Sequence, residues 1–303
     1  MAKVLVATGS GIRSFARDGE ADAELVGHPI SAISQEFGSL GLAVVDHQHI
    51  WQRNYAGEWS IVADAGIPLQ SIVGAGATIF AGAMNEAAVL RVSPSGEVER
   101  LASFDHVPGR EQWLAIGLPL GVRGLTVTAD GRVIFAAVHV GGIPFSIDRG
   151  DSWLPTIPVM FDVHEVRAHP SRPHLVAAAC AVGLCVSQDH GQTWRTFSDG
   201  LEITNSLAVG VLEDEVLFSI QDGPFAKRSQ IWRWKLGSDH LEQVRDGLPE
   251  WLDGKVDSNW ITTGKDQAAI LDGGGNLWLS QSGSRGWECI AKGLPYSSGL
   301  LLL

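Results

Sequence analysis

The sequence is poor in cysteine, in positive charge and in long apolar runs. Its three cysteines, Cys180, Cys185 and Cys289, form no even disulfide framework, and we interpret them as free thiols. The 22 lysines and arginines are outnumbered by 34 acidic residues, and the net charge of −12 argues against binding nucleic acid or an anionic membrane electrostatically. No apolar run reaches the roughly 18 residues that span a bilayer, and no signal peptide is recognisable. We therefore expect a cytoplasmic protein.

Glycine and tryptophan are abundant instead. The 303 residues include 36 glycines and 11 tryptophans, a composition that suits many short strands joined by tight turns rather than helices. The chain is 45% hydrophobic and shows no break in composition, so it is long and apolar enough to bury a large core. We expect a single domain spanning residues 1–303.

One short motif recurs along the chain. The segment SIDRGDSW at residues 146–153 is repeated as SQDHGQTW at residues 187–194. A degenerate copy, SQSGSRGW, occupies residues 280–287. In the first two copies a carboxylate can accept backbone N–H bonds, a glycine can adopt positive φ, and a tryptophan starts the returning strand. The motif therefore predicts a hairpin turn that recurs with a period of about 40 residues, which is the length of a propeller blade.

The pattern Ser-x-Asp-x-Gly-x-(Ser/Thr)-Trp resembles the Asp box of the bacterial neuraminidase repeat (BNR) proteins. This superfamily of β-propellers contains sialidase-like glycosidases, sortilin-type receptors and photosystem assembly factors. The segments DVHEVRAHP (162–170) and GLCVS (183–187) are similar to uncharacterised bacterial sialidase-like members. The resemblance implies for sialidases three arginines and a tyrosine nucleophile paired with a glutamate. This chain lacks their Arg-Ile-Pro sequence and has only Tyr55 and Tyr296, so we do not expect a true sialidase.

The repeat divides the whole chain into four-stranded antiparallel blades. In the clearest copy we expect strands at 163–168, 174–180, 183–187 and 194–197. The first blade has strands at 4–7, 11–16 and 23–26, and we expect residues 299–303 to complete it and close the ring. The prediction is an all-β, seven-bladed β-propeller whose blades span residues 1–27 plus 297–303, 28–65, 66–104, 121–158, 162–201, 202–249 and 255–295, with insertions at 105–120 and 250–257.

Strand alternation decides which face carries a site. The Asp boxes join the third and fourth strands, so they lie on the face opposite the start of each innermost strand, and we interpret Asp148, Asp189, Trp153 and Trp194 as structural. Aligning the blades on the innermost strand places a polar residue at the same point in each repeat, and such a ring is expected to border a channel mouth or a ligand site. The ring comprises Ser31, Gln70, Arg123, His164, Asn205, Asn259 and Ser298.

Loops on the same face add further polar groups, and long loops are usual places for binding residues. They carry Asp46, His47, His49, Glu86, His139, Asp222 and Arg228, together with His106, Arg110, Glu111 and Trp113 in the first insertion. His47, His49, His139 and His164 could converge on a transition metal, but their spacing is no linear metal motif and we expect none bound. His164 and Glu165 offer an acid/base pair, although adjacent strand residues point to opposite faces.

We interpret the chain as an enzyme acting on a small polar or anionic molecule at this mouth, by general acid/base hydrolysis or elimination. His164 and Arg123 would be central, with binding by Ser31, Gln70, Asn205, Asn259, Ser298, His139, His49, Glu86 and Trp113, and no cofactor. One alternative is a non-enzymatic scaffold that holds a protein or a small ligand. Another is a metal-dependent enzyme that uses the four histidines.

Overall fold

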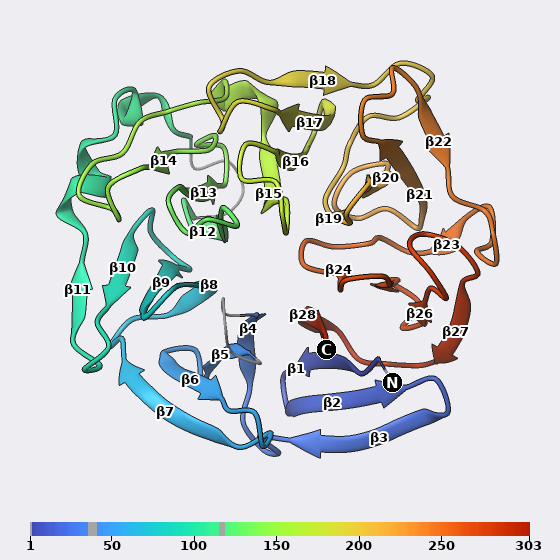
Figure 1. Cartoon of the computed structure of the whole chain (residues 1–303), viewed down its shortest axis with the longest axis horizontal. Coiled ribbons are helices and arrows are strands. Elements are labelled where there is room, and N and C mark those ends of the chain that lie inside the picture. The colour runs from blue at the N-terminus through green and yellow to red at the C-terminus, as the bar shows by residue number, and fades with distance from the viewer. Residues whose placement is uncertain (1, 36–40, 115–118) are drawn as a thin grey trace.

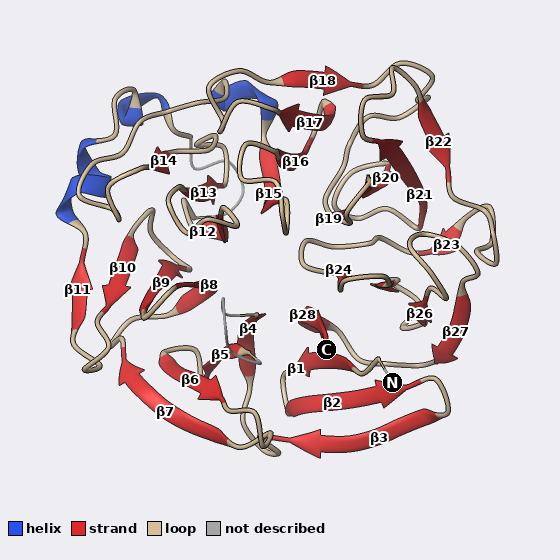
Figure 2. Cartoon of the chain, viewed as in Figure 1, coloured by secondary structure: helices blue, strands red, loops and turns tan. Residues whose placement is uncertain are grey.

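Seven antiparallel sheets are arranged in a ring around a central axis in the computed structural model (Figure 1). It describes residues 2–35, 41–114 and 119–303. Within these ranges helix is limited to three short 3-10 turns, η1 (Ala102–His106), η2 (Arg110–Gln112) and η3 (Val159–Phe161) (Figure 2). No helix among the described residues is of a length and apolarity that would carry it through a membrane. The predicted seven-bladed β-propeller is confirmed.

Each blade runs outward from an innermost strand beside the axis. The first three blades are made of β28 (Ser297–Leu302), β1 (Val4–Thr8), β2 (Gly11–Ala16) and β3 (Gly19–Glu24); β4 (Ile30–Ser34), β5 (Leu42–Val45), β6 (His49–Arg53) and β7 (Trp59–Asp64); and β8 (Leu69–Ala75), β9 (Thr78–Ala83), β10 (Val89–Val92) and β11 (Val98–Arg100). Blade four has three assigned strands, β12 (Val122–Val127), β13 (Ile134–Val138) and β14 (Phe145–Ser146). In place of a fourth strand, Leu154 forms an isolated β-bridge to Phe145 of β14.

The remaining blades follow the same order. Blade five is β15 (Val163–Ala168), β16 (Val176–Cys180), β17 (Gly183–Ser187) and β18 (Arg195–Phe197); blade six is β19 (Val209–Val211), β20 (Glu215–Gln221), β21 (Arg228–Lys235) and β22 (Leu241–Gln243); and blade seven is β24 (Ile261–Thr263), β25 (Ala268–Leu271), β26 (Leu277–Leu279) and β27 (Glu288–Ala291). The second insertion contributes β23 (Leu252–Asp253), which pairs with β21.

The two ends of the chain close the ring. Strand β28 pairs antiparallel with β1, with Val4 opposite Leu302 and Ala7 opposite Gly299, and Figure 1 shows the red strand beside the blue one. Lys3 and Leu303 exchange backbone hydrogen bonds of 3.1 and 2.9 Å. The predicted closure is confirmed, and the closing strand begins at Ser297, two residues earlier than expected.

The outer strand of the first blade was misplaced by the sequence interpretation. We expected it at 23–26, whereas β3 spans Gly19–Glu24. The chain makes a tight turn directly after β2, so the returning strand starts earlier. Leu25 has φ of +50°, a left-handed conformation that ends the strand before Val26.

Burial across a blade falls from the inside outward. Strands β1 and β16 are buried at every residue because neighbouring blades cover both of their faces, and their sequences, VLVAT and VAAAC, are correspondingly almost continuous apolar runs. The outer strand β3, GEADAE, is mostly exposed. The core therefore consists of layers between the blades, and the inner strand ends border the central channel.

Both intact Asp boxes form the same hydrogen-bonded turn. In the second copy Asp189 accepts from the Thr193 amide at 2.8 Å and from the Ser187 hydroxyl at 2.8 Å, and the Gly191 amide donates to Ser187 Oγ at 2.8 Å. His190 adopts φ of +61°, and the Trp194 indole N–H donates to the Gly191 carbonyl at 3.2 Å. The carboxylate is therefore fully used within its own turn.

Replacing Asp189 by alanine should lower the free energy of unfolding by about 1 to 3 kcal/mol, because the Thr193 and Ser187 donors lose their acceptor. Urea denaturation measures this change. Asp199→Ala is the matched control, since Asp199 is exposed on the same blade. Ligand affinity should be unchanged in both variants. Weaker ligand binding at undiminished stability would place the Asp box at the site and contradict the face assignment.

Candidate functional site

The seven predicted ring residues share a structural position. Five of them are the extra residue of a β-bulge in the innermost strand of their blade, and the pairing register steps past each one: Ser31, Gln70, Arg123, His164 and Ser298. Asn205 and Asn259 lie shortly before the shorter inner strands, Asn205 four residues before the start of β19 and Asn259 two residues before the start of β24. Bulges re-aim side chains and are over-represented next to active sites. The sequence alignment thus located a recurring irregularity at one end of the channel.

Three of these side chains bond to backbone carbonyls, and two of the three bonds join neighbouring blades. The Ser31 hydroxyl donates to the Leu69 carbonyl at 2.8 Å, and the Ser298 hydroxyl donates to the Ile30 carbonyl at 2.6 Å, each reaching the next blade. The Gln70 amide donates to the Ala83 carbonyl at 3.3 Å within its own blade. These contacts give Ser31, Ser298 and Gln70 structural roles that our sequence interpretation had not assigned.

An acid/base pair lies at the start of β15. His164 donates through Nδ1 to the Ser206 carbonyl at 2.8 Å, so its other nitrogen, Nε2, is left to face Asp162 Oδ2 at 3.5 Å. Asp162 lies directly before the strand with φ of +46°, and His164 is the bulge residue, whereas the Glu165 carboxylate is taken up by Arg167 and by the Val209 and Asn259 backbone amides. Against the opposing effect of burial, the contact with His164 lowers the pKa of Asp162. The partner of the histidine is therefore Asp162 and not the predicted Glu165.

Several polar groups around this pair have no partner. Arg123 is half-buried and makes no hydrogen bond or ion pair with any described residue. Burial lowers its pKa, and the negative charges of Asp162 and Asp257 oppose that shift. Buried atoms without a hydrogen bond include His139 Nδ1, Asp162 Oδ1 and Asn205 Oδ1. Because buried polar atoms normally find a partner, this group is prepared for a ligand.

His139 is electrostatically linked to the same cluster. Burial, followed by the positive charge of Arg123, lowers the pKa of His139, so its imidazole is neutral at pH 7. A neutral ring beside a guanidinium can offer a hydrogen bond without adding charge. Arg123 and His139 therefore lie close enough to influence each other electrostatically.

A cavity of about 350 Å³, which we name the second cavity, borders the mouth near Arg123. It is lined by Phe225, Trp260, Lys255 and Tyr296, among others. The Tyr296 hydroxyl contacts Asp257 Oδ2 at 3.2 Å, and although the residue as a whole is 66% exposed, desolvation of the hydroxyl together with that carboxylate raises the pKa of Tyr296 to about 12. Lys255 Nζ lies 2.5 Å from the same carboxylate. Asp257 is therefore occupied, and Tyr296 remains a neutral hydrogen-bonding group.

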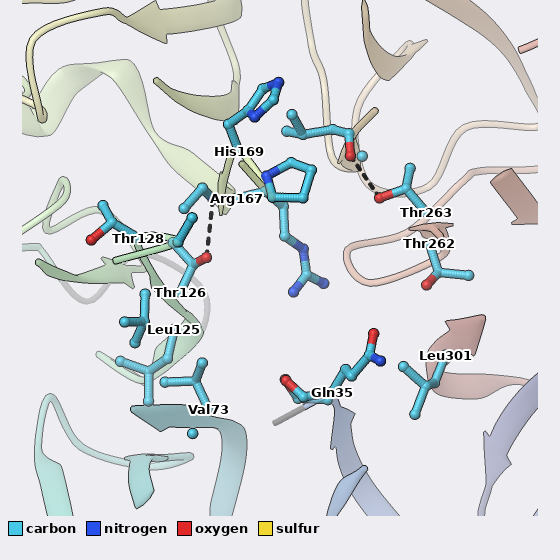
Figure 3. Close-up of a pocket in the computed structure, with 18 of the residues that line it drawn as sticks. Gln35, Val73, Leu125, Thr126, Thr128, Arg167, His169, Thr262, Thr263 and Leu301 are labelled. Atoms are coloured by element: carbon cyan, nitrogen blue, oxygen red, sulfur yellow. Dashed lines mark hydrogen bonds between the residues drawn. The ribbon is translucent and has the colours of Figure 1, made fainter. Parts of the chain in front are cut away.

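The larger cavity lies at the opposite end of the channel, where the inner strands finish. It has a volume of about 370 Å³, and all seven inner strands contribute to its wall. Figure 3 shows the Arg167 guanidinium projecting into it, with Gln35 on the facing side. Our sequence interpretation missed this cavity, because residue spacing gives no measure of channel width. The sequence signal that could have indicated the cavity is the pair of charged residues, Glu165 and Arg167, at alternate positions of one inner strand.

The predicted loop residues do not gather at the mouth as one group. His49 lies 3.7 Å from Asp64 and 3.9 Å from Asp46, and Glu86 lies 3.3 Å from Arg100. Trp113 is only 8% exposed and packs against Phe104 in the core, which leaves little of its surface for a ligand.

The four predicted metal-ligating histidines are divided between distant parts of the ring. His47, which is exposed, and His49 belong to blade two, whereas His139 and His164 belong to blades four and five. The described residues contain no group of three or more His, Cys, Asp or Glu side chains that could hold a metal ion. Elemental analysis of purified protein should find no stoichiometric transition metal. One equivalent of metal that is lost in His139→Ala or His164→Ala would contradict this expectation.

Comparison with known proteins places the fold but not the chemistry. No family model matches the sequence, and no curated protein matches it either. Among solved structures, the chain is similar to an ancestral GH74 enzyme, with TM-score 0.66 and 11% identity over 88% of this chain and 39% of that one. It is also similar to the GH74 xyloglucanase from Xanthomonas campestris, with TM-score 0.59 and 16% identity over 95% of this chain and 46% of that one. The similarity is in fold.

The coverage of these structures is unequal. The chain spans less than half the length of either GH74 structure. At 11% and 16% identity, the similarity shows the fold alone. The reaction of this chain must still be argued from its own residues.

Proposed function

We propose that the chain is a cytoplasmic hydrolase or lyase of the Asp-box propeller type, acting on a small polar or anionic molecule at the channel mouth. The observation that supports it is the Asp162–His164 pair beside Arg123, a half-buried guanidinium without a hydrogen-bonding or ionic partner among the described residues. The guanidinium suits a substrate carboxylate or phosphate, which it can hold by two hydrogen bonds. The GH74 enzymes of similar fold favour a hydrolase over a purely structural propeller.

The histidine is arranged to transfer a proton. The Ser206 carbonyl accepts the Nδ1 proton, so in the neutral tautomer of this imidazole the lone pair is on Nε2. When Nε2 takes a proton from an attacking water, or from a carbon next to the substrate carboxylate, the resulting imidazolium faces Asp162 and is stabilised by its charge. The same proton then passes to the leaving group. Both hydrolysis and elimination fit this sequence.

The two asparagines of the ring have different roles. Asn205 Oδ1 is buried and unpaired, so it can accept a hydrogen bond from a substrate hydroxyl or amine. The side-chain oxygen of Asn259, Oδ1, already accepts a hydrogen bond from Arg167 Nη2 at 2.8 Å. The backbone N–H of Asn259 donates to Glu165 Oε2 at 3.0 Å. We therefore keep Asn205 as a binding residue and assign Asn259 to the support of Arg167.

The test separates binding from chemistry. A thermal-shift screen of small carboxylates and phosphates, run with and without a chelator, identifies a ligand for calorimetry and turnover assays. Arg123→Met should weaken its binding by about 10- to 100-fold, the usual value of a hydrogen bond to a charged group. His164→Gln should retain binding and reduce turnover by about 100-fold or more.

Arg132→Met is the matched control for the arginine, because the Arg132 side chain is 83% exposed. Unchanged binding in Arg123→Met, or unchanged turnover in His164→Gln, would refute the proposed site.

A non-enzymatic scaffold is the second candidate, and exposed aromatic rings at the rim of the mouth favour it. Phe225 is 93% exposed and Tyr296 is 66% exposed, and both line the second cavity. Large exposed apolar side chains often mark a binding surface. In this case ligand affinity would fall in a Phe225→Ser variant, and no turnover would depend on His164.

A further inference from the structure

The cavity at the other end of the channel is built around a buttressed arginine. Arg167 donates through Nε to Glu165 Oε1 at 2.7 Å and through Nη2 to Asn259 Oδ1 at 2.8 Å. These contacts occupy one edge of the guanidinium and fix its plane. Nη1 makes no hydrogen bond with any described residue, and Figure 3 shows the guanidinium extending into the cavity.

Glu165 holds this arginine at a cost to folding. Its side chain is almost fully buried, and desolvation raises the pKa of its carboxyl, while Arg167 and two backbone amides oppose the shift. Those amides, of Val209 and Asn259, donate to Oε2 at 3.1 and 3.0 Å. With donors alone around it, the carboxyl group is satisfied as a carboxylate. A buried ion pair often contributes little to the stability of a fold. A gain in stability therefore does not explain why Glu165 holds the Arg167 guanidinium in this orientation.

The other residues that line the cavity determine which kind of ligand it can hold. Arg167 is the only formally charged side chain among the described residues that line the cavity. His169 adds no charge, since Nδ1 accepts from the Ser171 and Arg172 amides, Nε2 is bonded to the Glu213 carbonyl, and burial lowers its pKa. The Thr262 hydroxyl lines the space and makes no hydrogen bond within the part of the chain that the structure describes, and apolar residues such as Leu125 and Leu301 line the same space.

We propose that this cavity is a second binding site, separate from the mouth at Arg123, and that it takes a small hydroxylated carboxylate. The free Nη1 group of Arg167 would hold the carboxylate, and Thr262 would bond to a ligand hydroxyl. The volume of about 370 Å³ lies within the range of small-molecule sites. The Arg167–Asn259 bond connects this site to a residue of the ring at the opposite mouth.

The experiment uses D-gluconate as the probe and D-glucose as its uncharged counterpart, both measured by isothermal titration calorimetry on the full chain. Gluconate should bind saturably and at least tenfold more tightly than glucose. Thr262→Phe, which fills the cavity without touching the Arg167 network, should abolish binding. Thr262→Val should weaken it by about three- to tenfold, the net value of one neutral hydrogen bond. Thr262→Ser is the matched control and should bind normally.

Arg123→Met distinguishes the two ends of the channel. Gluconate binding that survives Arg123→Met and disappears in Thr262→Phe supports the second site, whatever the outcome for the mouth. Binding lost in Arg123→Met and kept in Thr262→Phe would overturn it. So would an absence of saturable gluconate binding, or equal affinity for glucose.

Discussion

A protein that lacks residues 299–303 is expected to lose its cooperative fold and aggregate. These residues supply most of β28, which pairs with β1, and Leu300, Leu301 and Leu302 are each 5% exposed or less. Burying a leucine contributes about 1.5 to 3 kcal/mol, so three of them are comparable to the 5 to 15 kcal/mol by which domains are stable. The deletion also exposes the edge of β1, a template for pairing with other chains.

Size-exclusion chromatography and thermal melting followed by circular dichroism measure this outcome. Removal of Leu303 alone is the control, because it leaves every pair from Val4–Leu302 to Thr8–Ser297 intact. The shorter deletion should stay monomeric with a nearly unchanged melting temperature. If the five-residue deletion did the same, β28 would be unnecessary for closing the ring.

Arg167→Met should reduce the free energy of unfolding by about 3 to 5 kcal/mol, the usual cost of leaving a buried charge uncompensated. The charge in question is that of Glu165, whose side chain is only 2% exposed. Urea denaturation measures the change. Arg195→Met serves as the matched control, since Arg195 forms an exposed ion pair with Asp239 and should cost less than about 1 kcal/mol.

Acidity and a second substitution identify the cause of that loss. Burial raises the pKa of Glu165 above its unfolded value even with Arg167 beside it, and removing the arginine takes away an opposing charge, so in the variant folding favours the protonated form more strongly. Stability from a raised pKa is complete below the unfolded value of about 4.3 and is lost as pH rises, so the deficit should shrink as pH falls from 7. Adding Glu165→Gln should also recover part of it. A deficit independent of pH and of Glu165→Gln would indicate lost packing instead.

Much of the fold was predictable because the repeated turn is local. The spacing of SIDRGDSW and SQDHGQTW gives the blade length, and each turn satisfies its own hydrogen bonds without help from distant residues. The ends of strands were less predictable. Strand β3 starts at Gly19 because a tight turn at Arg17 and Asp18 follows β2 directly, and our sequence interpretation overlooked the Asp18-Gly19 dipeptide, which is a hairpin-turn signal.

The candidate site was predictable only in part. The polar ring was found from alignment, and the structure shows that this alignment followed a repeated bulge in five blades. Whether a side chain such as Ser31 meets a ligand or the neighbouring carbonyl depends on the distance between blades, which spacing does not contain. Asp162 could have been found by its nearness to His164 in sequence but not by strand alternation, because it lies outside β15 and His164 is a bulge residue. Trp113 could not, because its burial results from packing against Phe104.

The closure of the ring has a consequence for how the protein folds. The Ser297 hydroxyl donates to the Ala7 carbonyl at 2.7 Å across 290 residues of sequence, within the pairing of β28 with β1. Contacts of such high sequence separation form slowly, because the entropy of a very long loop must be lost before they contribute. Individual blades consist of local hairpins and can form early. We therefore expect the blades to form first, as an open arc, and the pairing of β28 with β1 to follow as the late, rate-limiting step.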